Sequence, residues 1–233
     1  MKKKAVFNWS GGKDSALALY KALISDEYDI VSLLTTISQD TQQSSMHLIP
    51  TTVLDAQAGS IGIPLYKAML PSKGLQGYEE EMRKAVTHFK EQGVTHFIFG
   101  DIFLHDVKKY REEQLAPYAI EVVEPLWNKT SEEIIEEFLT SGIRTRIVVT
   151  QADKLDKSFV GQDISRELID RLPKNVDPCG EEGEYHTLAY NGPIFKHPIE
   201  FLLEEPKELV YNVQLDTGET QTFRYWHTPI ITR

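Results

Sequence analysis

Cysteine is nearly absent from this sequence, since Cys179 is the single thiol among 233 residues. One cysteine forms neither an internal disulfide nor a Cys-x-x-Cys redox or zinc pair, which excludes both classes and favours a reducing cytoplasm. Long apolar runs are missing as well, because no stretch approaches the roughly 18 residues of a membrane span. Residues 1–4 lead into a short strand without the apolar core of a secretory signal. We therefore expect a cytoplasmic protein without a membrane segment.

An excess of basic residues is also missing. Lys and Arg number 25 against 35 Asp and Glu, which gives a formal net charge of −10. Non-specific nucleic-acid binding needs a basic surface that releases counterions from phosphates, so no nucleic-acid partner is expected. The chain does contain 41% hydrophobic residues, enough to bury the core of one large domain or two small ones.

In the first half of the chain, apolar runs typical of buried strands alternate with segments of helical periodicity. Strands are expected at 4–8, 29–35, 63–69, 95–101 and 119–123, and helices near 16–25, 50–62, 78–92 and 107–117. Strands and helices that alternate in this way form a doubly wound parallel sheet with right-handed crossovers. We therefore predict a Rossmann-like α/β nucleotide-binding domain over residues 1–125.

The pattern changes after Pro125-Leu126-Trp127, which we interpret as a hinge. Beyond it we expect a helix from Thr130, a strand at 147–150, a helix at 165–172 and an antiparallel hairpin over 209–225. These elements predict a smaller α+β domain over residues 126–233, which contributes to the substrate site. The hairpin has an exposed strand edge that invites pairing, so a homodimer is one expected assembly.

The stretch Ser10-Gly11-Gly12-Lys13-Asp14-Ser15 lies between an apolar strand and a helix. Its two glycines let the backbone turn tightly with N–H groups directed inward, and the helix adds the positive end of its dipole. Lys13 can place a point charge on phosphate oxygens, while Ser10 and Ser15 can donate hydroxyl hydrogen bonds. Asp14 would repel a bare phosphate, so we expect it to cap the helix or to help hold Mg²⁺. The stretch predicts a phosphate-binding loop.

The spacing of this loop differs from Gly-x-x-x-x-Gly-Lys-Ser/Thr and from Gly-x-Gly-x-x-Gly, so neither mononucleotide-kinase nor dinucleotide chemistry is indicated. An ordinary Gly-Gly turn is the alternative, but a turn alone does not need the Ser, Lys and Asp side chains around it. Open α/β sheets bind ligands at the carboxyl ends of their strands. Further nucleotide contacts are therefore expected at Thr35, Gly100 and Asp101.

A second informative stretch is the Gly-rich acidic segment 177–187, which precedes an apolar strand. Glu181 and Glu184 can ligate Mg²⁺ or ammonia, and His186 can accept a proton. A solvated acidic turn is the alternative, because runs of charge usually lie on the surface. The residues alone leave the two interpretations open.

Ser-Gly-Gly-Lys-Asp-Ser resembles the pyrophosphate loop of the PP-loop ATPases. Cys-Gly-Glu-Glu-Gly-Glu-Tyr-His-Thr, followed by Asn-Gly-Pro-Ile-Phe-Lys at 191–196, resembles the signature of the diphthine–ammonia ligase family within that superfamily. Gly100-Asp101-Ile102, Tyr110-Arg111-Glu112 and Pro125-Leu126-Trp127 follow in the family's order. The resemblance implies an adenine nucleotide alpha hydrolase-like fold with its active site between two domains. It also implies a ligase that adenylates a carboxylate with ATP, releases pyrophosphate and displaces AMP with ammonia.

The resemblance also implies roles for individual residues. Lys13 would stabilise charge on the ATP phosphates, and Glu181 and Glu184 would bind ammonium and accept its proton. The residues implied on the substrate side are Met46, His47 and Tyr185. The implied partners are ATP with Mg²⁺, ammonia and a carboxylate such as diphthine on elongation factor 2. His186 stands where members that complete diphthamide carry glutamate, so the chain resembles a histidine-variant branch associated with cobalamin metabolism.

Other functions stay open beside this one. The same ligase chemistry can act on a different carboxylate, such as a cobalamin precursor. A regulatory module that binds ATP without turnover would explain the phosphate loop but not the acidic segment. Sulfur transfer to tRNA would need catalytic cysteines and a basic surface, and the sequence has one cysteine and a net charge of −10.

Overall fold

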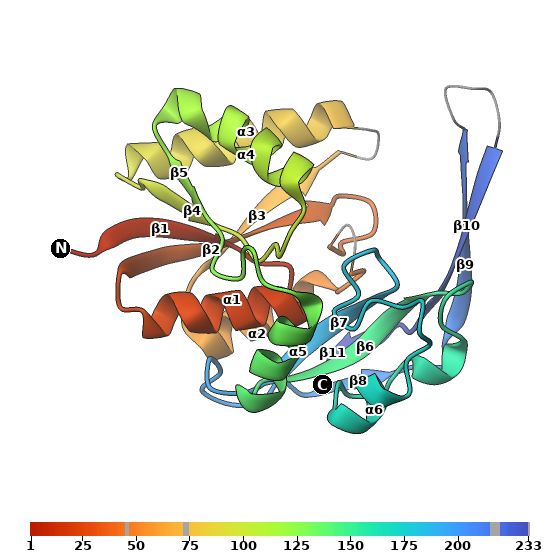
Figure 1. The fold of residues 1–233 in the computed structure, drawn as a ribbon. Coiled ribbons are helices and arrows are strands. Elements are labelled where there is room, and N and C mark those ends of the chain that lie inside the picture. The colour runs from red at the N-terminus through yellow and green to blue at the C-terminus, as the bar shows by residue number, and fades with distance from the viewer. Residues whose placement is uncertain (45–46, 72–74, 215–219, 233) are drawn as a thin grey trace.

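The structure is a computed structural model that describes residues 1–44, 47–71, 75–214 and 220–232. The first half of the chain forms a five-stranded sheet in the order β3-β2-β1-β4-β5 (Figure 1). Its strands are β1 (Lys3–Asn8), β2 (Tyr28–Ser38), β3 (Leu65–Leu70), β4 (His96–Ile98) and β5 (Glu121–Val123). Every pairing in this sheet is parallel, as the sequence pattern predicted.

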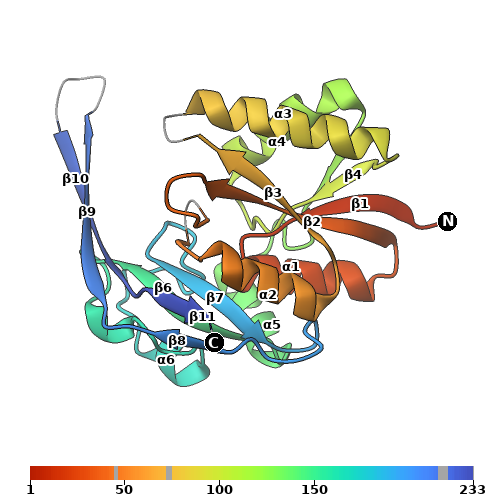
Figure 2. The ribbon, with the colours of Figure 1, turned by 180° about the vertical axis from the view of Figure 1, so that it is seen from behind.

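Helices cover both faces of this sheet (Figures 1 and 2). They are α1 (Lys13–Ile24), α2 (Thr51–Ile61), α3 (Leu75–Glu91) and α4 (His105–Leu115), with a short 3-10 turn, η1 (Ala116–Tyr118). The helices α1 and α2 lie on one face and α3 and α4 on the other, and a separate apolar cluster forms on each side. The predicted doubly wound α/β fold is confirmed. None of the described helices is long and apolar enough to cross a bilayer.

The strand expected at 95–101 is shorter than predicted, because β4 ends at Ile98. A Cβ atom at Gly100 would lie 3.0 Å from the Cα of Ser15, so the chain after β4 passes directly against the first turn of α1. That approach requires glycine. The strand order reverses at β1, between β2 and β4, which is the place where open α/β sheets bind ligands.

The second half forms a four-stranded antiparallel sheet in the order β7-β6-β10-β9, and β8 pairs with β11. The strands are β6 (Arg144–Gln151), β7 (Tyr185–Asn191), β8 (Phe201–Leu203), β9 (Lys207–Gln214), β10 (Thr220–His227) and β11 (Ile230–Thr232). The helices are α5 (Ser131–Thr140), α6 (Arg166–Asp170) and the 3-10 turn η2 (Lys157–Phe159). Thr130 and Glu133 form a capping box that starts α5 where the sequence predicted a helix.

The helix α6 and the hairpin of β9 and β10 can be compared with the elements that the sequence predicted. The helix expected at 165–172 covers only Arg166–Asp170, because Ser165 caps its start and Pro173 disfavours helical geometry in the residue before it. The hairpin of β9 and β10 is antiparallel as predicted and projects from the body of the molecule (Figures 1 and 2). Its predicted turn at 216–219 lies outside the described residues.

One buried side chain joins the two halves of the chain. Gln57 on α2 is fully buried, and its amide Nε2 donates to the carbonyl oxygens of Gly11 at 3.1 Å and Ala189 at 2.6 Å. Its Oε1 accepts a hydrogen bond from Trp9 Nε1 at 2.9 Å. The apolar cluster on this side also contains residues of both halves, so the division into domains at 125/126 stays a prediction.

We expect Gln57→Leu to destabilise the protein strongly. Leucine removes three buried hydrogen bonds and leaves the Trp9 Nε1–H without a partner, although the Gly11 carbonyl keeps its bond from the Ala189 N–H. A buried group left without a partner costs about 1–3 kcal/mol, so we expect a loss of roughly 3 kcal/mol in the free energy of unfolding. Urea unfolding measures it. Asp55→Asn, at an exposed position of the same helix, is the matched control and should change little. Equal stability of the two variants would contradict the role of Gln57.

Candidate active site

A cavity of about 850 Å³ lies at the carboxyl edge of the parallel sheet and is closed by the segment 179–187 of the second half. Its wall includes the turn after β1, the ends of β2 and β4, and the start of β7. The predicted site residues that line it are Ser10, Lys13, Asp14, Ser15, Thr35, His47, Gly100, Asp101, Glu181, Tyr185 and His186. The fold therefore brings together residues that are far apart in the sequence.

Gly11, Gly12 and Glu184 do not line this cavity. Gly11 has φ +84°, a left-handed conformation that favours glycine, and its carbonyl accepts a hydrogen bond from the N–H of Ala189 at 2.7 Å. A Cβ atom at Gly12 would lie 2.7 Å from Nε2 of His47 and 3.0 Å from the carbonyl of Thr187. The two glycines therefore allow the loop to pack closely between His47 and β7.

The two predicted serines are held within the loop. The Ser10 hydroxyl donates to Ser15 Oγ at 3.0 Å, and Ser15 Oγ donates to the carbonyl of Gly12 at 3.2 Å. Both residues line the cavity, so the hydroxyl pair lies at its wall beside the start of α1. The positive end of the helix dipole and these hydroxyls suit an anionic ligand.

Lys13 is almost completely buried, with its ammonium group paired with the Asp14 carboxylate and 6.0 Å from the Phe138 ring. Burial by itself lowers the pKa of Lys13, but Asp14 and the nearby acidic groups Cys179 and Tyr185 raise it, and the net pKa lies above the usual value. The lysine therefore stays charged beside the cavity. Its backbone N–H donates to Thr187 Oγ1 at 2.8 Å, which joins the loop to β7.

The acidic segment is folded around two carboxylates that face its own backbone. Asp177 accepts hydrogen bonds from the N–H of Cys179 at 2.7 Å and from the Ser131 hydroxyl at 2.6 Å. Glu184 is fully buried, and its two oxygens accept from the N–H groups of Asp177 at 3.0 Å and Glu182 at 3.1 Å. Glu184 therefore holds the loop in shape, whereas the side chain of Glu181 lies at the cavity.

Glu181 is the carboxyl group of this segment that is set for proton transfer. Burial, followed by the negative charge of Asp14, raises its pKa to about 8, although Lys13 acts in the opposite direction. A base works best when its pKa is near the working pH. Tyr185 supports the same loop, since its hydroxyl donates to the carbonyl of Pro178 and its ring packs against Gly180.

Cys179 is buried, and its thiol donates to the carbonyl of Ser131 at 3.2 Å. The fold places Lys13, which is distant in the sequence, close enough to favour the thiolate. Burial outweighs that effect and raises the pKa of Cys179 to about 12. The thiol is therefore not a nucleophile at neutral pH.

His47 and His186 form a pair at the cavity, with ring centroids 4.8 Å apart. Burial lowers the pKa of His186 to about 4, and burial together with the neighbouring His186 ring holds the pKa of His47 well below its usual range. Both rings are therefore neutral at neutral pH, and these lowered pKa values make each ring a weak proton acceptor there. Met46, the other predicted residue of this loop, lies outside the described residues.

The histidine shift predicts a pH dependence of stability. Since the pKa of His186 is lower in the folded chain than its ordinary 6.5, the unfolded chain binds more protons below pH 6.5, and stability falls as the pH is lowered toward 4. The raised pKa of Glu181 makes its own contribution to stability change with pH in the opposite direction. The free energy of unfolding should fall between pH 6.5 and 4.5 in both proteins, and we expect the fall to be about 2 kcal/mol smaller in His186→Asn than in the wild type. Urea unfolding at each pH measures it. Parallel curves for the two proteins would contradict this.

Gly100 and Asp101 lie at the cavity wall beside a charged network that sequence reasoning did not find. Asp101 pairs with Arg111 of α4, whose guanidinium group stacks 4.0 Å from the Phe99 ring centroid. Arg111 also lies 3.8 Å from Glu124, which Lys108 approaches at 3.3 Å. The Asp101 side chain is therefore already paired with Arg111. Of these two predicted residues, the backbone of Gly100 is the better candidate for contact with a ligand.

The donor set bears on the Mg²⁺ expectation. In the part of the chain that the structure describes, no three His, Cys, Asp or Glu side chains gather into a metal-binding group. Mg²⁺ is commonly held by one or two carboxylates together with substrate phosphates. Asp14 lies at the cavity wall beside the loop, so it fits that second mode and not a site made by protein alone.

The fold places this chain among Rossmann-like α/β proteins, with a Gly-Gly turn between β1 and α1 at the strand-order reversal. Family models described as diphthamide synthase N-terminal domain and diphthamide synthase C-terminal domain match residues 1–116 and 130–225. The chain therefore belongs to the diphthine–ammonia ligase family of diphthamide synthases.

Individual relatives agree with this assignment. The diphthine–ammonia ligases of Rattus norvegicus and Homo sapiens are each 25% identical over 213 residues, which covers 82% of this chain and 79% of the relative. The diphthine–ammonia ligase of Danio rerio is 25% identical over 214 residues, with 82% of this chain and 83% of the relative covered.

Proposed function

We propose that the chain is an ATP-dependent ligase that adenylates a carboxylate, releases pyrophosphate and then forms an amide with ammonia. The observation that supports this most directly is the meeting of Lys13 from the first half and Glu181 from the second at one cavity. Family membership and the names of the relatives support the same chemistry. The single cysteine is a free thiol, which is compatible with the reducing cytoplasm that we propose as its location.

In the first step, an oxygen of the acceptor carboxylate attacks the α-phosphorus of ATP, and the bond to the β-phosphate breaks. Lys13 and the hydroxyls of Ser10 and Ser15 would stabilise the charge that gathers on the phosphates. Mg²⁺, held by Asp14 and the phosphates, would neutralise part of that charge. Thr35 and the backbone at Gly100 line the same cavity and would contact the nucleoside.

In the second step, ammonia attacks the acyl carbon, the bond to AMP breaks and one proton leaves the nitrogen. Glu181 is our candidate acceptor for that proton, and the ring of His186 is a second but weaker base, because burial lowers its pKa to about 4. Glu184 would act through the loop that positions Glu181. A cavity closed by the second half would exclude water that otherwise hydrolyses the acyl adenylate.

The proposed acceptor is diphthine on elongation factor 2, because the relatives are named as diphthine–ammonia ligases. The alternative is another carboxylate, such as a cobalamin precursor, treated by the same chemistry. Incubation with ATP, Mg²⁺ and ammonium, followed by mass spectrometry of each acceptor, tests the choice. An amide on elongation factor 2 would support diphthine as the substrate. An amide on the other acceptor alone would assign that carboxylate as the substrate instead.

The free edge of β9 at the end of the antiparallel sheet supports a homodimer as a further proposal. Light scattering across a range of protein concentrations tests it. A constant monomer mass would rule the dimer out.

A further inference from the structure

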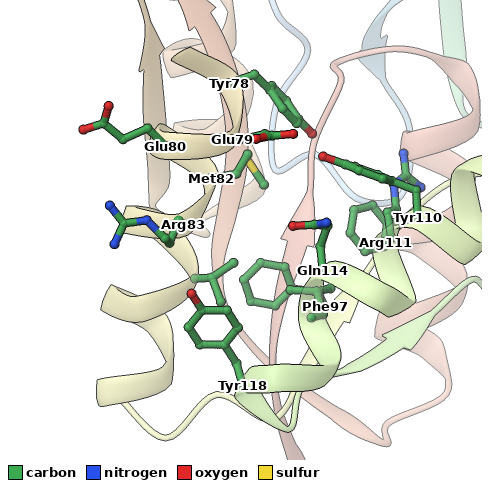
Figure 3. Close-up of a pocket in the computed structure, with 13 residues that line it drawn as sticks. Tyr78, Glu79, Glu80, Met82, Arg83, Phe97, Tyr110, Arg111, Gln114 and Tyr118 are labelled. Carbon is green, nitrogen blue, oxygen red and sulfur yellow. The ribbon is translucent and has the colours of Figure 1, made fainter. Parts of the chain in front are cut away.

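A second cavity lies between α3 and α4, on the face of the sheet that the helices α1 and α2 do not cover (Figure 3). Its volume is about 470 Å³. Phe97 from β4 lies at its base together with Phe99, and Val86 and Leu115 add apolar surface from the two helices. We call this space the side pocket. Nothing in the proposed ligase chemistry uses its interior.

The entrance of the side pocket is aromatic and polar. Tyr78 from α3 and Tyr110 from α4 direct their hydroxyl groups toward each other, and the Gln114 side chain points into the space between the helices (Figure 3). Glu80 and Arg83 point away from it. The pocket thus combines ring surfaces with hydrogen-bonding groups, the composition of a small-molecule site.

The positive charge of Arg111 at the side pocket is already balanced. Arg111 lines it, but its guanidinium group is paired with Asp101, approaches Glu124 at 3.8 Å and stacks on Phe99. Glu124 is paired in turn with Lys108 at 3.3 Å. An anionic ligand would have to compete with Asp101 for Arg111, and the acidic residues Glu79 and Glu80 also line the pocket, so the pocket disfavours a ligand with net negative charge.

We propose that the side pocket binds an uncharged planar ring compound, aromatic or heteroaromatic, with hydrogen-bonding groups on its edge. The rings of Tyr78, Tyr110 and Tyr118 line the pocket and are at least partly exposed, so they offer stacked or edge contacts to such a ligand. The Gln114 amide and the tyrosine hydroxyls can each donate and accept at its edge. A volume of about 470 Å³ lies within the range of small-molecule sites, roughly 300–1,000 Å³.

The side pocket adjoins the candidate active site. Tyr78, Met82, Phe99 and Arg111 line both cavities. A ring bound between α3 and α4 would therefore lie beside a nucleotide at the phosphate loop without occupying its place. This inference concerns binding alone, so it holds or fails independently of the ligase proposal.

Indole is a suitable uncharged planar probe. Methyl NMR of the intact chain, labelled at valine and leucine, reports Val86 and Leu115, which line only the side pocket. We expect indole to shift both signals in a saturable way, and the shifts to persist when ATP is present. Unchanged signals would overturn the proposal. Displacement of indole by ATP would also overturn it, because the pocket would then belong to the nucleotide site.

A filled pocket provides the matched test. Gln114→Trp introduces an indole ring from an exposed helical position that points into the pocket, and we expect it to weaken binding of free indole by about tenfold or more. Glu113→Trp on the same helix does not line the pocket and should bind as the wild type does. Equal weakening in both variants, or in neither, would contradict the assignment.

Discussion

Lys13→Met is expected to lower ATP-dependent pyrophosphate release by about a hundredfold to a thousandfold, the usual cost of removing one group that stabilises charge in a transition state. Methionine fills the same buried space near Phe138 but carries no charge. The Asp14 carboxylate loses its partner, yet its side chain is 25% exposed and can be solvated. The loss should therefore appear in turnover and not in the fold.

Lys21→Met is the matched control for Lys13→Met. Lys21 lies on the same helix and pairs with Glu137 at 2.6 Å on the surface, where such pairs contribute little. A coupled pyrophosphate assay with the accepted carboxylate measures turnover, and thermal unfolding checks both variants. Turnover of Lys13→Met equal to that of Lys21→Met would refute the role of Lys13.

Glu181→Gln is expected to lose amide formation and keep its stability, whereas Glu184→Gln is expected to lose stability. Glu181→Gln keeps the shape of the side chain and removes a buried group whose charged form burial disfavours, so stability should hold or rise. Amide formation should fall by about 10²–10⁴-fold, the usual contribution of general acid–base catalysis. Pyrophosphate formation should fall less, because the first step does not need this proton acceptor.

Glu184→Gln should instead weaken the fold. One of the two oxygens that accept backbone N–H groups becomes an NH₂ group, which leaves a buried N–H without a partner at a cost of about 1–3 kcal/mol. Glu132→Gln is the control, since that side chain is exposed and does not line the cavity. Urea unfolding and an amide assay on all three variants separate the two roles. Full stability of Glu184→Gln would contradict the structural role of Glu184, and full amide formation by Glu181→Gln would contradict the proton-transfer role of Glu181.

The alternation of apolar strands and helical periodicity was enough to predict the parallel sheet, because buried parallel strands need continuous apolar runs. The turn between β1 and α1 could be predicted for a similar reason, since a strand, two glycines and a helix start are adjacent in sequence, whereas phosphate binding there stays a prediction. The end of β4 could not be predicted, because it depends on the contact between Gly100 and the Ser15 backbone.

The orientation of the two glutamates also lay beyond the sequence. Glu181 and Glu184 belong to one Gly-rich segment, and only the folded loop shows that Glu184 accepts backbone N–H groups while Glu181 reaches the cavity. Gln57 was missed for a related reason, and Arg111 was named only within the Tyr110-Arg111-Glu112 motif, without a role. Each acts through partners distant in the chain, and the only local signal for Gln57 was a polar residue at a buried position of a helix.

Identification of the nucleotide products tests the central claim most directly. The protein would be incubated with ATP, Mg²⁺, ammonium and diphthine-bearing elongation factor 2 or the alternative acceptor, and the products followed by ³¹P NMR. The proposed ligase chemistry predicts AMP and pyrophosphate in amounts that depend on the acceptor. ADP and phosphate, or no turnover with any acceptor, would contradict adenylation and favour a module that binds ATP without using it.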